Sequence, residues 1–242
     1  MNHTSAVTAC VLIIGNEILS GKTQDTNLQF LGTELAALGI RLVEARVLRD
    51  DRETIASVLN ECRQRYTYVF TTGGIGPTHD DITAESVAYA FGCELVRNEE
   101  AVTRLTQTGR ELTPARLKMA MIPAGASLVD NPVSHAPGFR LENVFVLAGI
   151  PRIAQAMFES ARGELTAGPP IHSASLDVFA SEGDIAAPLT AIADAHPEVE
   201  IGSYPFQRDG RYGASLVVRG TDQDAIESVI REIAAAMAKL GA

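Results

Sequence analysis

Residues 67–83 read TYVFTTGGIGPTHDDIT, and this stretch predicts the fold of the chain more directly than any other. Its first part, Thr67–Thr71, is a short run of β-branched and aromatic residues, which is typical of a buried strand. Three glycines follow, and we expect a helix from about Thr83 to Phe91. A strand that enters a glycine-rich turn and then a helix indicates one unit of a parallel α/β sheet.

The residues before this stretch repeat the same alternation of strand and helix. Val7–Ile14 is a short apolar run that predicts a buried strand, and Arg41–Leu48 predicts a second one. Between them, Asn27–Leu38 places four leucines on one helical face. We expect Asp50 to cap the following helix, with Glu53 three residues later as in a capping box. In such parallel sheets, ligands bind beyond the carboxyl ends of the strands.

The pattern changes after Gly163–Pro170, a segment rich in glycine and proline that we interpret as a linker. We therefore expect one domain at 1–165 and a small α+β domain at 171–242. The second domain is predicted from a strand at 175–180, a helix at 182–195, strands at 199–204 and 213–219, and a final amphipathic helix. This β-α-β-β-α order is KH-like. It lacks a Gly-x-x-Gly loop and a basic face, so RNA binding is not expected.

The composition excludes several classes of protein. The chain has 242 residues and a net charge of -10, without a run of Lys or Arg, so we expect no nucleic-acid partner. Its longest apolar stretch, Ala6–Ile14, is far shorter than the ~18 residues of a membrane helix, which predicts a cytoplasmic protein with no membrane partner. Cys10, Cys62 and Cys93 are scattered, and we interpret them as buried or inert thiols rather than a disulfide or zinc framework.

The glycine-rich turn is the first candidate site. Gly73, Gly74 and Gly76 let the backbone approach a ligand and allow successive N–H groups to point into one concavity that binds phosphate. The positive end of the following helix would add to this attraction. The alternative is a tight turn in which Asp81 or Thr83 is an ordinary helix cap.

Two adjacent carboxylates favour a ligand site over a simple turn. Asp80 and Asp81 would repel phosphate unless a hard divalent cation lay between them and the ligand. Such an ion can also polarise phosphorus and lower the pKa of a bound water. In the turn after the first strand, Glu17 is a further candidate metal ligand or water-orienting group. Asn27 is a candidate ligand-binding residue, or only a helix cap.

A third motif contains Ser134 and His135, which are adjacent in sequence. Adjacent residues do not favour a nucleophile and base pair, so we expect no hydrolase triad, and a lone histidine in a turn is more often structural.

Four motifs occur in order along the chain: GNEILSG at 15–21, GGIGPTHDDIT at 73–83, NPVSHAPGF at 131–139 and AGIP at 148–151. Together they resemble the N-terminal molybdopterin-binding domain of the competence/damage-inducible protein A (CinA-type) family. The resemblance extends, more distantly, to MoaB/Mog-like domains of molybdenum-cofactor biosynthesis and to a domain that precedes the synthetase part of some FAD synthases. It covers about Thr8–Arg162.

This resemblance implies a three-layer αβα domain with a mostly parallel sheet, and a homo-oligomer. For several members it implies a pyrophosphatase that uses a divalent metal (Mg, Mn or Co) and acts on ADP-ribose or FAD-like compounds. Residues that match the family's ligand positions are Gly73, Gly74, Gly76, Thr78, Asp80, Asp81, Thr83, Glu17, Asn27 and the basic residue Lys118. Met119 stands where the family commonly has Gln, and Ile153 where it has Glu, which points to a different choice of substrate.

Three hypotheses remain open at the level of sequence. The chain is a metal-dependent nucleotide pyrophosphatase, with Asp80, Asp81 and Glu17 as catalytic residues. Alternatively, it binds molybdopterin or a nucleotide without turnover, or it is a molybdopterin adenylyltransferase. The paired carboxylates favour the pyrophosphatase, because a protein that only binds phosphate has little use for them.

Overall fold

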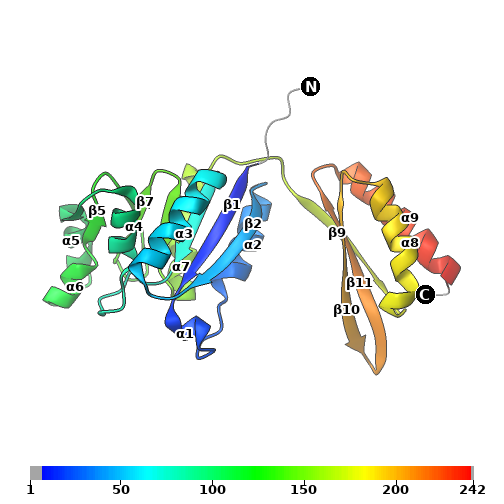
Figure 1. The fold of residues 1–242 in the computed structure, drawn as a ribbon, viewed down its shortest axis with the longest axis horizontal. Coiled ribbons are helices and arrows are strands. Elements are labelled where there is room, and N and C mark those ends of the chain that lie inside the picture. The colour runs from blue at the N-terminus through cyan, green and yellow to red at the C-terminus, as the bar shows by residue number, and fades with distance from the viewer. Residues whose placement is uncertain (1–6, 241–242) are drawn as a thin grey trace. The chain divides into compact units, whose positions relative to one another are not determined.

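Figure 1 shows the computed structural model, which describes residues 7–240. The chain divides into two compact units, with the boundary between Gly168 and Pro169. The segment before this boundary is bound to the first unit, because Thr166 N donates to Tyr68 Oη and Gly168 N donates to Leu38 O. The predicted linker, Gly163–Pro170, therefore belongs in part to the first unit, and its first two residues lie in a 3₁₀ turn at Arg162–Glu164.

A six-stranded sheet in the order β2-β1-β3-β8-β7-β6 forms the centre of the first unit. The pairs β2–β1, β1–β3 and β3–β8 are parallel, whereas β8–β7 and β7–β6 are antiparallel. The six strands are β1 (Thr8–Ile14), β2 (Arg41–Leu48), β3 (Tyr68–Thr72), β6 (Ser127–Val129), β7 (Gly138–Leu141) and β8 (Val144–Leu147). The predicted mostly parallel α/β fold is thus confirmed.

Two helical layers cover this sheet, as Figure 1 shows. Helices α2 (Asn27–Ala37) and α7 (Pro151–Ala161) pack on one face, where Leu31, Leu35 and Phe158 join one apolar cluster. Helices α3 (Arg52–Arg65) and α4 (Thr83–Phe91) pack on the other face. Because strand β1 is buried on both faces, its sequence is continuously apolar rather than alternating.

Between α4 and β6, a small subregion completes the first unit. It contains β4 (Leu95–Arg97), α5 (Glu99–Thr106), α6 (Pro114–Lys118) and β5 (Met121–Pro123), with β4 and β5 paired antiparallel. Sequence reasoning did not anticipate these elements, nor the four-residue helix α1 (Asn16–Leu19) in the turn after β1.

The predicted cap of α3 is wrong by one residue. Asp51, not Asp50, is the N-cap, and its side chain accepts a hydrogen bond from Thr54 N. Asp50 instead accepts one from Asn16 N, which ties α1 to the end of β2. Glu53 therefore lies one position too early for a capping box.

Strand β2 contains a β-bulge at Val43. Ala9 lies opposite Leu42, but the next residue, Cys10, lies opposite Glu44. Leu42 packs in the cluster under α2 and α7, whereas Cys10 belongs to the cluster under α3. The extra residue thus turns Glu44 toward the α3 face, a position that regular alternation would give to Val43.

The second unit is a three-stranded antiparallel sheet in the order β10-β11-β9 with two helices packed on it. Its elements are β9 (His172–Val178), α8 (Glu182–Ala195), β10 (Glu200–Arg208), β11 (Arg211–Gly220) and α9 (Gln223–Leu240). The predicted order of elements is confirmed. Within residues 7–240, no helix has both the length and the apolar composition of a membrane span.

Candidate functional site

The glycine turn leaves strand β3 with a backbone that only glycine adopts without strain. Gly73 has φ 100° and Gly74 has φ 68°. A Cβ on Gly73 would lie 2.1 Å from the backbone oxygen of Ile14, at the end of the neighbouring strand β1. The turn is therefore built at the carboxyl edge of two adjacent parallel strands.

Thr83 holds this turn against the start of α4. Its backbone N donates to Gly74 O at 2.9 Å, and its hydroxyl donates to Gly73 O at 2.9 Å. The side chain is fully buried, so its oxygen is not presented to a ligand. Ile82 is the N-cap of α4, and the expectation that Asp81 or Thr83 is an ordinary cap is wrong.

Three consecutive backbone N–H groups of the turn lack an acceptor. Among residues 7–240, no hydrogen bond is formed by the N–H of Gly74, Ile75 or Gly76. By contrast, Gly73 N donates to Leu147 O, and Thr78 N donates to the Asp81 carboxylate. Successive free N–H groups next to a helix N-terminus are suited to phosphate oxygens.

The two carboxylates converge on one hydroxyl. Thr78 Oγ1 lies 2.6 Å from Asp80 Oδ1 and 2.5 Å from Asp81 Oδ2. A hydroxyl has one proton to donate, so it can satisfy only one of these two oxygens. The other carboxylate oxygen then faces a lone pair of the Thr78 hydroxyl. The three oxygens together form a negatively charged group of hard metal ligands.

The same contacts perturb the titration of Asp80. The hydrogen bond from the Thr78 hydroxyl, together with the backbone N–H of Asp80, holds the pKa of this carboxyl below its ordinary value. The charges of His79 and Lys118 lower the pKa further. Asp80 is therefore ionised at neutral pH, which is the form that binds a cation.

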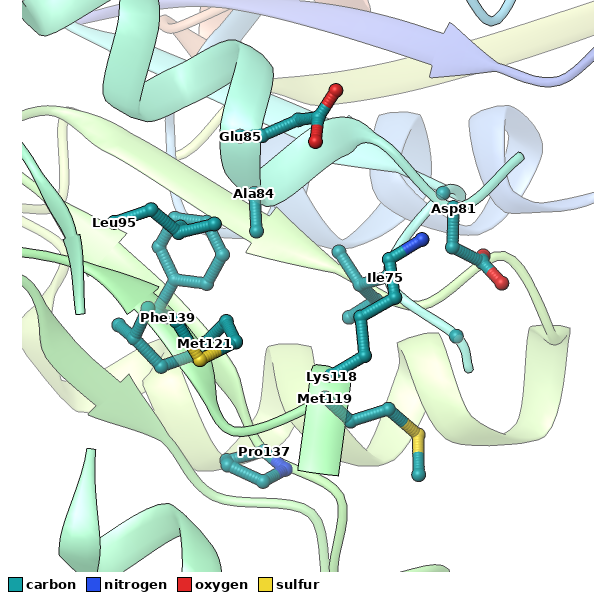
Figure 2. A pocket seen from close by; sticks show the side chains of 13 residues that line it. Ile75, Asp81, Ala84, Glu85, Leu95, Lys118, Met119, Met121, Pro137 and Phe139 are labelled. Carbon is teal, nitrogen blue, oxygen red and sulfur yellow. The ribbon is translucent and has the colours of Figure 1, made fainter. Parts of the chain in front are cut away.

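A cavity of about 190 Å³ opens beside the turn. Figure 2 shows Lys118 extending from α6 toward Asp81, with Met121, Leu95 and Phe139 forming an apolar wall. The Lys118 ammonium donates to Thr78 O at 2.5 Å, which places its charge next to the acidic group. Gly74 and Gly76 form part of the lining.

Met119, which stands where the related family commonly has Gln, also lines this cavity. Small-molecule and cofactor pockets usually enclose roughly 300–1,000 Å³, so this cavity is smaller than a typical complete ligand site.

Glu17 and Asn27 lie on the first-strand side of the turn. The Glu17 carboxylate folds over Gly15, where a Cβ would lie 2.6 Å from its oxygen. Among the described residues, no group of three acidic, His or Cys ligand atoms within 4.8 Å contains Glu17, Asp80 or Asp81. Without a bound ion, Glu17 is thus not assembled with the aspartates into a three-ligand cluster.

Asn27 is the first residue of α2 rather than its cap, which is Thr26. Its Nδ2 donates to Gly149 O at 2.8 Å, while its Oδ1 is buried without a partner. Gly149 in turn is so close to the glycine turn that a Cβ there would lie 3.2 Å from Gly73 Cα. Asn27 therefore joins the β8–α7 connection to the site, and its Oδ1 is a buried acceptor without a partner among the described residues.

The NPVSHAPGF motif forms a tight turn organised by Asn131, a residue that sequence reasoning did not single out. The Asn131 side chain accepts from Val133 N and Ser134 N, and donates to Ser134 Oγ and Ala136 O. His135 has a positive φ of 61° in this turn, and no hydrogen bond joins it to Ser134. The turn places Pro137 and Phe139 in the cavity wall.

Comparison with known proteins agrees with this division of the chain. The domain family described as a probable molybdopterin binding domain matches residues 10–166, and the middle domain of FAD synthase matches residues 170–241. A protein of Archaeoglobus fulgidus is 31% identical over 223 residues, covering 92% of this chain and 94% of that protein.

Two further similarities concern the first unit. A CinA-like protein of Syntrophomonas wolfei is 37% identical over 161 residues, which cover 63% of this chain and 39% of that protein. The crystal structure of the protein CinA from Thermoplasma acidophilum, described as having unknown function, is 34% identical with a TM-score of 0.62. It aligns with 66% of this chain and 99% of that chain.

Proposed function

Because this chain belongs to the family of probable molybdopterin-binding domains, we propose that its glycine turn binds a phosphate-bearing nucleotide and that a divalent ion there promotes pyrophosphate hydrolysis. The second unit matches the middle domain of FAD synthase. This pairing of domains favours an ADP-containing dinucleotide, such as FAD or ADP-ribose, over free molybdopterin.

The convergence of Asp80 and Asp81 on the single proton of Thr78 carries the proposal. Lys118 supplies one positive charge beside two carboxylates, so a net negative charge remains, and hard divalent ions such as Mg²⁺ and Mn²⁺ prefer oxygen ligands, which borderline Co²⁺ also accepts. Asp80 and Asp81 are the residues that would hold the ion. When bound, such an ion neutralises phosphate charge and lowers the pKa of a coordinated water.

The protein's own groups would bind and orient the phosphates. The free N–H groups of Gly74, Ile75 and Gly76 bind phosphoryl oxygens, and the buried Thr83 keeps the turn in the conformation that presents them. Lys118 supplies a further positive charge beside the leaving phosphate. Asn27 offers an unpaired acceptor from α2, and Glu17 is a further acidic group on the same side.

The apolar wall of the cavity supports a second candidate function. The apolar wall, formed by Leu95, Met121 and Phe139, provides a surface for a flat ring, as in a pterin or flavin. Binding of such a ring does not require Asp80 and Asp81 to take part in catalysis. In that case the chain binds molybdopterin or a nucleotide without turnover, or transfers an adenylyl group to molybdopterin.

Calorimetric titration with ADP-ribose and FAD, in Mg²⁺, Mn²⁺, Co²⁺ or chelator, tests the proposal, together with chromatographic separation of the products. We expect tight binding only with a divalent ion, and AMP as a product together with ribose 5-phosphate or FMN. Equal affinity in chelator would refute the metal bridge. Binding without product would favour the second candidate.

A further inference from the structure

Two cysteines that are far apart in sequence meet in the core of the first unit. Cys10 in β1 and Cys62 in α3 are both fully buried, and their Sγ atoms lie 3.5 Å apart. Sequence spacing predicted inert, scattered thiols, because neither residue belongs to a Cys-x-x-Cys pair. The crossing of α3 over β1 brings them together, which no local spacing reveals.

A carboxylate completes this group. The bulge at Val43 turns Glu44 to the α3 face, directly opposite Cys10 in the register of β1 and β2. One ligand atom from each of Cys10, Glu44 and Cys62 lies within 4.8 Å of the other two. Bulges commonly re-aim a side chain at a functional position, and here the re-aimed group is the carboxylate.

We propose that Cys10, Cys62 and Glu44 form a zinc-binding site between β1, β2 and α3. In a tetrahedral site with Zn–S bonds of about 2.3 Å, two sulfurs are separated by about 3.8 Å. The observed separation of 3.5 Å is close to that edge. An ion can therefore be accommodated by side-chain rotations, without moving the helix from the sheet.

The donor set selects the class of ion. Ca²⁺ and Mg²⁺ take six or more ligands, nearly all of them oxygen, whereas thiolates favour zinc and other soft cations. Both thiols are fully buried, and each must give up its proton to bind zinc as a thiolate. Entry of Zn²⁺ releases the two thiol protons to solvent, and the net charge of this buried cluster does not change.

Neighbouring side chains orient the carboxylate. Glu44 Oε1 accepts from Arg46 Nε at 2.7 Å, and Glu44 Oε2 accepts from the Tyr66 hydroxyl. Arg46 is itself held by two hydrogen bonds to Glu61. Outer partners of this kind fix metal ligands in many sites.

The position of Glu44 also provides a route for the ion. Its side chain is 28% exposed, so an ion first meets this carboxylate from solvent, whereas both thiols are fully buried behind it. The Tyr66 hydroxyl donates to Glu44 and thus serves as a hydrogen-bond donor rather than as a ligand. The site shares no residue with the glycine turn and does not depend on the proposed function.

Cobalt substitution tests the site. The full chain, stripped of metal and kept reduced, is titrated with Co²⁺. We expect binding at the thiols to produce thiolate-to-cobalt charge-transfer absorption and the visible bands of tetrahedral cobalt, and Zn²⁺ to abolish both. Cobalt held by the oxygens of Asp80 and Asp81 would give no such charge transfer. Saturating zinc should raise the Tm by about 5 °C or more.

Two variants test the proposed ligands, and a third serves as the control. Cys62→Ser should lose the charge-transfer band, and Glu44→Gln, at a partly exposed position, should weaken cobalt binding by about tenfold or more. Cys93→Ser removes the third cysteine, which lies outside the group, and should bind like the wild type. If Cys62→Ser does not fold, the cobalt affinity of Glu44→Gln compared with that of Cys93→Ser still tests the site.

Two results would overturn the proposal. One is a wild-type chain without a charge-transfer band, or with a band that Glu44→Gln leaves at full affinity. The other is a chain that binds no zinc but forms a Cys10–Cys62 disulfide with peroxide, which would make the pair a redox element instead.

Discussion

At the scale of single residues, the proposed function depends on how Thr78 shares one proton between two carboxylates. Asp81→Asn removes the charge that would hold a divalent ion, yet its amide oxygen can still accept from Thr78 N. We expect kcat for dinucleotide hydrolysis to fall by on the order of 100-fold or more, with a Tm close to wild type. Product assays at saturating metal, with thermal melts alongside, provide the measurement. A variant with the wild-type rate would leave Asp81 a structural role only.

Gly74 has a separate role that a matched pair of variants can isolate. Gly74→Ala places a Cβ 2.1 Å from the Thr83 hydroxyl oxygen at φ 68°, whereas Gly21→Ala at φ 71° meets nothing within 4 Å. Both variants carry left-handed strain of about 1–2 kcal/mol, but only the first displaces the clamp of the turn. Chemical denaturation should show the larger loss for Gly74→Ala, and calorimetry a loss of ligand binding only there. Equal stability losses would contradict the role of Thr83 as a clamp.

At the scale of elements, the first turn of α3, the helix that contains Cys62, is stabilised by the N-cap Asp51. Asp51→Ala removes the acceptor for Thr54 N and Oγ1, and should destabilise the first unit by about 1 kcal/mol, within a range of roughly 0.5–2. Asp50→Ala removes only the contact to Asn16 N, and urea denaturation should show a smaller effect. The reverse order would restore the cap that the sequence predicts.

That one-residue error illustrates what sequence can and cannot predict here. Long, periodic elements were predicted correctly, because α2, α3 and α9 repeat their apolar residues over several turns. The elements between Leu95 and Ala161 were missed. All of them except α7, which has 11 residues, are three to eight residues long, and such short segments give too little periodicity. Asp50 and Asp51 are equivalent as caps by residue type, and only the end of β2 decides between them.

The candidate site was predictable to a similar degree. A glycine-rich turn with two aspartates is visible as a local pattern, and the structure adds that Thr83 is buried and that Lys118 reaches the same turn. The meeting of Cys10 and Cys62 depends on a crossing of distant elements, and the position of Glu44 beside them depends on a bulge in β2. Neither leaves a signature in residue spacing.

At the scale of the whole molecule, the second unit has its own dependence on pH. The charged ring of His196, after α8, donates from Nδ1 to Glu198 and from Nε2 to Glu232 of α9, and these two hydrogen bonds raise its pKa above 6.5. A raised pKa adds stability that is fully present below the unfolded value and disappears as pH rises through the folded value. Thermal melts of this unit should therefore decline from about pH 6.5 upward, and His196→Gln should flatten that decline. If Tm declines with pH equally in His196→Gln and in the wild type, the two hydrogen bonds of His196 do not contribute to stability.

The pairing of β3 with β8 has a consequence for the order in which the first unit folds. Strands β1, β2 and β3 are joined by short crossovers, whereas Val69 and Val144 pair only after the long segment between them has closed. Gly73 N is anchored on Leu147 O, so the glycine turn is secured in this late step. We expect Val11→Ala to slow refolding and Val146→Ala mainly to speed unfolding in stopped-flow chevrons. During synthesis, the chain would then form a compact intermediate that does not bind ligand until β8 has paired with β3.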